Sequence, residues 1–97
     1  MNAMRYRASE NYELRSIAGE HMLIPVGGAD FEPGTLLLLN ETGAFLWELL
    51  REPKGAAELL AAARAEFEDP TGEMETSIRE FLAQMREKKL LEIEGEA

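Results

Sequence analysis

A histidine beside a carboxylate is the first combination in this chain that could do chemistry. The single histidine, His21, directly follows Glu20, and an imidazole paired with a carboxylate can perform general acid–base catalysis. The surrounding pattern predicts a strand next to a turn, and adjacent strand residues point to opposite faces. We therefore expect that the two side chains do not meet and that His21 is an exposed residue beside the turn.

The other reactive side chains are no better placed for catalysis. The chain has no cysteine, which excludes thiolate nucleophiles and thiolate metal sites. No serine stands in a Gly-x-Ser-x-Gly context. A cluster of carboxylates lacks the Asp-x-Asp-x-Asp-Gly spacing of a calcium loop; its members are Glu66, Glu68, Asp69 and Glu73. We expect a protein that is not an enzyme, binds no metal and needs no cofactor.

Length and charge restrict the class of protein further. The chain has 97 residues, 45% of them hydrophobic and 30% charged, which is typical of one folded, soluble domain. Its net charge of −9 would repel a phosphate backbone, so nucleic acid is not an expected partner. The aliphatic run at residues 36–39 is far shorter than the roughly 20 residues that span a bilayer. The acidic residues Glu10 and Glu13 interrupt any signal sequence, so we expect a cytoplasmic protein without membrane contact.

The first half of the chain predicts strands. Residues 12–17 begin with Tyr12 and Leu14 on one face, the alternation of a half-buried strand. Met22, Ile24 and Val26 line one face of a second strand, and a tight turn at residues 18–20 joins the two into a hairpin. Residues 35–39 predict a third strand that is apolar on both faces. Its exposed edge could accept an extended peptide.

Three helices are predicted after these strands. The first is capped by Asn40 or Thr42 and is apolar on most sides, so Trp47 within it should be buried. The second, at residues 56–67, and the third, from about residue 74 to 89, each carry apolar residues within an arc of about 100°. Strands followed by helices predict an α+β fold, here a three-stranded antiparallel sheet followed by three helices in a winged helix-turn-helix-like order. We assign residues 1–10 to a flexible arm, 11–93 to the domain and 94–97 to a frayed tail.

Residues 39–50 carry the most specific pattern, Leu-Asn-Glu-Thr-Gly-Ala-Phe-Leu-Trp-Glu-Leu-Leu. Together with residues 17–25, the Glu58-Leu59 start of the second helix and residues 74–91, this pattern resembles the PqqD-like family of precursor peptide recognition elements. The resemblance runs from residue 12 to about residue 92 and implies a winged-helix-like binding module. Family members often have serine or threonine where Gly55 stands, so the second helix lacks a capping hydroxyl here.

The resemblance also implies a ligand and a partner. Similar proteins bind the leader of a ribosomally made precursor peptide as an added strand, and present it to a modifying enzyme, commonly a radical S-adenosylmethionine enzyme. Three residues of the third strand would pair with the leader, three apolar residues of the third helix would form the groove wall, and two arginines would meet acidic leader side chains. In that order they are Leu36, Leu37 and Leu38; Ile78, Leu82 and Met85; Arg79 and Arg86.

Two other classes stay open on the residues alone. A carrier protein would also be small and acidic, but it needs a serine in an Asp-Ser-Leu-like context, which this chain does not have. A winged-helix regulator or protein-interaction module would share the expected fold, although the net charge argues against DNA. The residues do not distinguish pyrroloquinoline quinone from another peptide-derived product. We expect a monomer or a weak homodimer.

Overall fold

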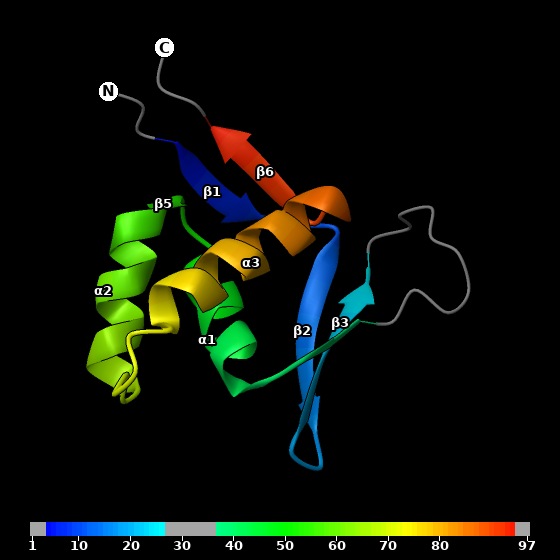
Figure 1. The fold of residues 1–97 in the computed structure, drawn as a ribbon. Coiled ribbons are helices and arrows are strands. Elements are labelled where there is room, and N and C mark those ends of the chain that lie inside the picture. The colour runs from blue at the N-terminus through cyan, green and yellow to red at the C-terminus, as the bar shows by residue number, and fades with distance from the viewer. Residues whose placement is uncertain (1–3, 27–36, 95–97) are drawn as a thin grey trace.

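The computed structural model describes residues 4–26 and 37–94, which form three helices and two antiparallel sheets (Figure 1). One sheet has the strand order β2-β3-β4 and the other has the order β5-β1-β6. The α+β class and the three helices agree with the sequence analysis, but the described residues form six strands, not three. The elements are β1 (Arg5–Ala8), β2 (Tyr12–Ile17), β3 (Glu20–Pro25), β4 (Leu37–Leu39), α1 (Glu41–Leu49), β5 (Lys54–Gly55), α2 (Ala56–Glu66), α3 (Met74–Glu87) and β6 (Leu91–Glu94).

The predicted hairpin is present as β2 and β3. Its two-residue turn has positive φ at both positions, 53° at Ala18 and 82° at Gly19, which is the type I′ geometry that matches the twist of antiparallel strands. Ile17 and Glu20 close the turn as opposite partners. Glycine adopts such a φ freely, whereas alanine adopts it at a cost.

The face of β3 that packs inward differs from the predicted one. Leu23 is 1% exposed and belongs to the core, so Met22 and Ile24 lie on the opposite face of the strand, because strand side chains alternate. Val26 lies just beyond the end of β3. The prediction that grouped Met22, Ile24 and Val26 on one face therefore did not identify the core residue of this strand.

Helix α1 begins where the sequence predicted. The Asn40 side chain accepts a hydrogen bond from the backbone N–H of Gly43 at 2.7 Å, which caps the helix. A Cβ on Gly43 would lie 3.4 Å from Cε1 of Phe81 in α3, so the missing side chain lets α3 approach the start of α1. Trp47 is 3% exposed, which confirms its predicted place in the core.

The second sheet corrects the prediction of a flexible arm at residues 1–10. Strand β1 pairs with β6 along Arg5–Ala8 and with β5 at its beginning, so this part of the chain belongs to the domain; residues 1–3 lie outside the described residues. Glu94 is the last residue of β6, and the rest of the predicted tail, residues 95–97, also lies outside them. Figure 1 shows β1 and β6 at the top and the β2–β3 hairpin at the lower right, with β1 leading directly into β2.

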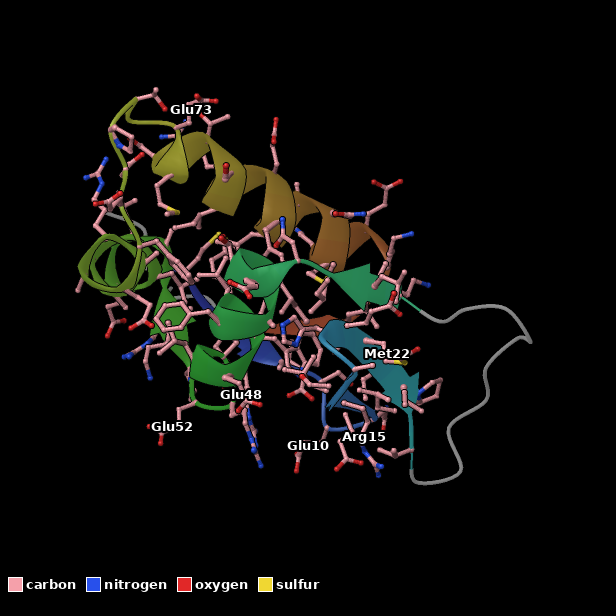
Figure 2. The ribbon with its side chains drawn as sticks, turned by 90° about the horizontal axis from the view of Figure 1, so that it is seen from below. Glu10, Arg15, Met22, Glu48, Glu52 and Glu73 are labelled. Atoms are coloured by element: carbon pink, nitrogen blue, oxygen red, sulfur yellow. The ribbon has the colours of Figure 1, made fainter. Side chains whose placement is uncertain are left out.

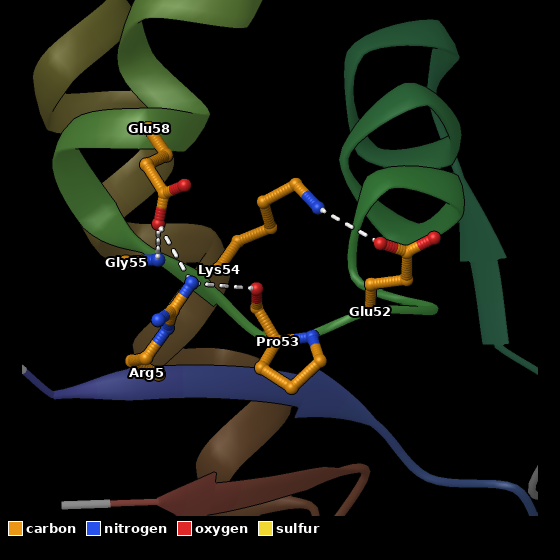
Figure 3. Close-up of polar contacts among 6 residues, drawn as sticks. All are labelled: Arg5, Glu52, Pro53, Lys54, Gly55 and Glu58. Atoms are coloured by element: carbon orange, nitrogen blue, oxygen red, sulfur yellow. Dashed lines mark hydrogen bonds and ion pairs between the residues drawn. The ribbon is translucent and has the colours of Figure 1, made fainter.

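Glu58 forms the half of a capping box that does not need a hydroxyl at Gly55. Its Oε1 accepts a hydrogen bond from the Gly55 N–H at 2.9 Å (Figure 3), which is the carboxylate half of a capping box. The guanidinium of Arg5 lies 3.5 Å from the same oxygen and donates to the Pro53 carbonyl at 3.3 Å. The start of α2 is therefore tied to β1.

Helix α3 packs one face into the core. Ile78, Leu82 and Met85 are 2%, 6% and 0% exposed. After the helix ends, the N–H of Leu90 donates to the Met85 carbonyl at 2.9 Å, while Lys89 has a φ of 62°, a Schellman motif. None of the described helices is long and apolar enough to cross a membrane.

Candidate functional site

The backbone of β3 shows which way the strands of the first sheet direct their hydrogen bonds. The N–H of Val26 donates to the Asn11 carbonyl at 2.9 Å. Opposite residues of an antiparallel pair alternate between bonded and non-bonded pairs. Val26 and Asn11 are therefore a bonded pair. Met22 and Arg15 are opposite partners four residues further along the register, an even number, so they are a bonded pair as well. Met22 therefore directs its backbone N–H and C=O toward β2.

The open edge of β4 follows from that alternation. The neighbours of Met22 in β3 direct their backbone groups the other way, toward Leu37 and Leu39. Leu38 lies opposite Met22, so its own N–H and C=O point away from β3. Strand β4 is the last strand of this sheet among those described. Leu38 thus offers an N–H donor and a C=O acceptor at a free edge, the arrangement that accepts an added strand.

The side chain of Leu38 is also accessible. It is 59% exposed and shares the outer face of the sheet with Met22 and Ile24, whereas Leu37 and Leu39 pack against the core. Met22, on the strand next to β4, is marked in Figure 2. A strand added to β4 would therefore meet leucine side chains on both faces of the sheet.

A groove lies between this edge and α3. It has a volume of about 490 Å³. Its floor and β4 side include Leu38, Leu39, Gly43 and Leu46. The α3 side is formed by a row spaced three or four residues apart, which is one face of a helix; its members are Ser77, Glu80, Phe81 and Gln84.

Carboxylates line the groove from the α2–α3 connection to the middle of α3. They come from the α2–α3 connection and from α3 itself, and they are Glu68, Asp69, Glu73 and Glu80. Asp69 accepts hydrogen bonds from the Met74 N–H and from Arg64, each at 3.1 Å, so it caps α3 and is ion-paired. Glu73, labelled in Figure 2, accepts a hydrogen bond from the Thr71 hydroxyl at 2.8 Å.

Among the described residues, Leu38 is the one predicted site residue that lines this groove. Leu36 lies outside the described residues, and Leu37 turns its backbone toward β3. The apolar residues of α3 that were assigned to the groove wall instead fill the core, because the arc that they share faces the buried cluster and not the groove; these are Ile78, Leu82 and Met85.

The two arginines lie on another side of α3. Arg79 follows Ser77 by two residues, and Arg86 follows Gln84 by two, which places each about 160° around the helix from its groove-lining neighbour. Neither arginine lines the groove. Arg79 is paired with Glu75 at 2.8 Å. The structure therefore does not support a basic rim on the groove.

Sequence reasoning missed Ser77, Phe81 and Gln84. Their spacing of three or four residues places them on one face of the helix. Polar residues flank the apolar arc of α3 on both sides, however, so the sequence did not show which flank lines a groove. Which flank faces β4 depends on the packing of α3 against α1, and only Gly43 hinted at that contact. A search for small residues opposite a large aromatic residue could have selected Phe81.

His21 is a half-buried residue of β3, not an exposed residue of the turn. Its Nδ1 lies 2.6 Å from the Ser16 hydroxyl across the hairpin. No hydrogen bond or ion pair joins His21 to a carboxylate among the described residues. Among the described residues, no group of three His, Cys, Asp or Glu side chains is placed to hold a metal ion.

Comparison with known proteins identifies the family. The family model for coenzyme PQQ synthesis protein D, PqqD, matches residues 20–91, which include β3, β4, β5, all three helices and the first residue of β6. The chain belongs to the PqqD family. No match was found among curated proteins.

A solved structure is similar to this PqqD-family domain over most of its length. It is described as TbiB1 in complex with the TbiA(beta) leader peptide, and the two chains are 29% identical with a TM-score of 0.68. The match covers 89% of the present chain and 94% of the other. The two proteins therefore share their fold nearly from end to end.

Proposed function

We propose that this PqqD-family domain binds the leader segment of a ribosomally made precursor peptide as an additional strand on β4. The observation that carries the proposal is the backbone of Leu38, which pairs with no other strand among the described residues and lies beside a groove lined by α3. An edge strand supplies main-chain hydrogen bonds, and the adjacent groove supplies side-chain selectivity. The similar structure of TbiB1 with a leader peptide supports this assignment.

The geometry of an added strand decides what the leader side chains would contact. The leader residue opposite Leu38 would exchange two backbone hydrogen bonds with it, as bonded antiparallel partners do. Successive leader side chains would point alternately into the groove, toward Phe81 and Leu39, and onto the outer face, toward Leu38 and Met22. The leader would thus present apolar residues to both faces.

The domain would act by presentation and not by catalysis. In this proposal it holds the leader while a peptide-modifying enzyme, such as a radical S-adenosylmethionine enzyme, acts on the rest of the precursor in the cytoplasm. Membership of the PqqD family supports this step. The domain would have a winged-helix-like arrangement, with the β2–β3 hairpin as the wing and α2–α3 as the helix pair.

Titration with a defined peptide tests the binding. The probe is the synthetic leader of the precursor encoded beside this gene, and calorimetry should give a dissociation constant on the order of micromolar or lower. Amide shifts in a ¹⁵N-labelled sample should centre on Leu38, Ser77 and Phe81. Absence of heat and shifts would reject the proposal. Shifts confined to the hollow between β1, β2 and α1, which Tyr12 and Trp47 help to line, would place the peptide elsewhere.

Binding to duplex DNA tests the alternative that the protein is a winged-helix regulator. Carboxylates at the groove and a net charge of −9 oppose a phosphate backbone. We therefore expect no salt-sensitive association with a random duplex. Binding that weakens steeply with salt would favour a winged-helix regulator instead.

A further inference from the structure

The groove beside β4 is lined by negatively charged side chains, which bear on the charge of the peptide that it binds. We infer that the leader bound there carries a lysine or arginine side chain that points toward the α2–α3 connection, where it pairs with groove carboxylates. This inference rests on the proposed leader binding and adds the chemical class of the peptide: an extended segment that is apolar at β4 and cationic at the start of α3.

All ionisable side chains that line the groove, among the described residues, are acidic. The α2–α3 connection contributes Glu68, Asp69 and Glu73, and α3 contributes Glu80. No lysine, arginine or histidine of the described chain lines it. The free edge and the groove define the binding site, and the carboxylates determine which charge it accepts.

Most of this negative charge is not compensated within the protein. Asp69 is neutralised by Arg64, 3.1 Å away. Glu73 is hydrogen-bonded to the Thr71 hydroxyl, which is uncharged and leaves the negative charge in place. Glu68 and Glu80 form no ion pair within the described part of the chain. Three carboxylates therefore remain for a cationic side chain of the ligand.

The basic residues of α3 do not offset these carboxylates. Arg79 and Arg86 lie about 160° around the helix from Ser77 and Gln84, and Arg79 is already paired with Glu75. The net charge of −9 for the whole chain also attracts a cationic peptide at longer range. An acidic leader, which the sequence had suggested, would be repelled at the groove.

Charge removal at the groove and at a distant strand provides matched variants. Glu73→Gln with Glu80→Gln removes two charges beside the groove. Glu92→Gln with Glu94→Gln removes two charges from exposed positions on β6, in the other sheet. Both pairs change the net charge equally, so only a local effect can distinguish them.

Two peptides complete the design. The first is the synthetic leader of the adjacent precursor, and the second is the same leader with every Lys and Arg replaced by Gln. Binding is measured by calorimetry and by stopped-flow fluorescence at about 0.1 M and about 1 M salt, over which the screening length falls from about 10 Å to about 3 Å.

We expect the natural leader to bind the groove variant roughly 3- to 10-fold more weakly than the wild type, as loss of two partly exposed ion pairs would give. The β6 variant should bind like the wild type. The Gln-substituted leader should lose the same factor with wild-type protein and be insensitive to the groove variant.

Three results would overturn the inference, and only the last of them also overturns leader binding. If the natural leader binds wild type and the groove variant equally at both salt concentrations, the cationic pairing is wrong while leader binding stands. The same holds if the leader contains no basic residue. If neither peptide binds wild type at all, leader binding itself fails, and the inference fails with it.

Discussion

Replacing Leu38 by proline should remove leader binding while leaving the domain folded. Proline has no N–H, and the N–H of Leu38 points to the free edge, away from β3. The change deletes one hydrogen bond to the leader and leaves a leader carbonyl without its partner. Such a loss costs about 1–3 kcal/mol, so the dissociation constant should rise about 5- to 150-fold.

Leu37→Pro is the matched variant on the same strand. The N–H of Leu37 points to Leu23 of β3, and its side chain packs against the core. Proline there removes a hydrogen bond inside the sheet, so we expect a loss of about 2 kcal/mol of stability and a melting temperature lower by roughly 8–16 °C. Leu38→Pro should lower it far less.

Leu38→Ala separates the side chain from the backbone. It keeps the N–H and removes the exposed isobutyl group, so its effect on binding should be smaller than that of proline. Calorimetry with the synthetic leader, after circular dichroism has shown each variant to be folded, gives the comparison. If folded Leu38→Pro binds the leader with wild-type affinity, the leader does not add to the edge of β4, and the reasoning from the hairpin register is refuted.

Three further predictions concern other parts of the molecule. Arg79→Gln with Arg86→Gln should not slow leader association at low salt, because neither side chain lines the groove; slower association in stopped-flow measurements would return the arginines to the site. Asn40→Ala should cost about 1 kcal/mol by removing the cap of α1, seen as a lower midpoint in urea, and an unchanged midpoint would show that the cap is not used. Ala18→Asn should raise the stability by up to about 1 kcal/mol, since asparagine tolerates the positive φ at this turn position, and a lower melting temperature would contradict the type I′ turn.

Local patterns predicted the hairpin and the helices because their signals lie within short segments. The alternation of Tyr12 and Leu14, the Asn40 cap and the apolar arc of α3 each reflect interactions between near neighbours in the sequence. The second sheet could not be read in this way. Arg5 pairs with Gly55 and with Glu94, and strands of two to four residues are too short to show a period.

The inward face of β3 was ambiguous for a related reason. Met22, Leu23 and Ile24 form a continuous apolar run, so alternation cannot show which face is buried. The structure buries Leu23 and leaves Met22 on the outer face, next to Leu38. The apolar outer residues that obscured the pattern are the ones proposed to contact the leader.

The groove proposed here uses the strand and the helix that the sequence analysis assigned to the site, but a different side of that helix. Apolar residues of an amphipathic helix serve the core first, and Ile78, Leu82 and Met85 do so here. A shallow groove beside such a helix is lined by its flanking positions. Choosing between the two flanks requires the position of β4 relative to α3, which depends on tertiary packing.

Hydrogen exchange at the amide of Leu38 is the most direct test of strand addition. In the free protein, this amide should exchange quickly, while those of Leu37 and Leu39 are already protected by β3. With the synthetic leader at about 100 times its dissociation constant, exchange at Leu38 should slow by roughly 100-fold, with little change at Leu37. An amide at Leu38 that exchanges at the same rate in the free and the saturated protein would contradict the account.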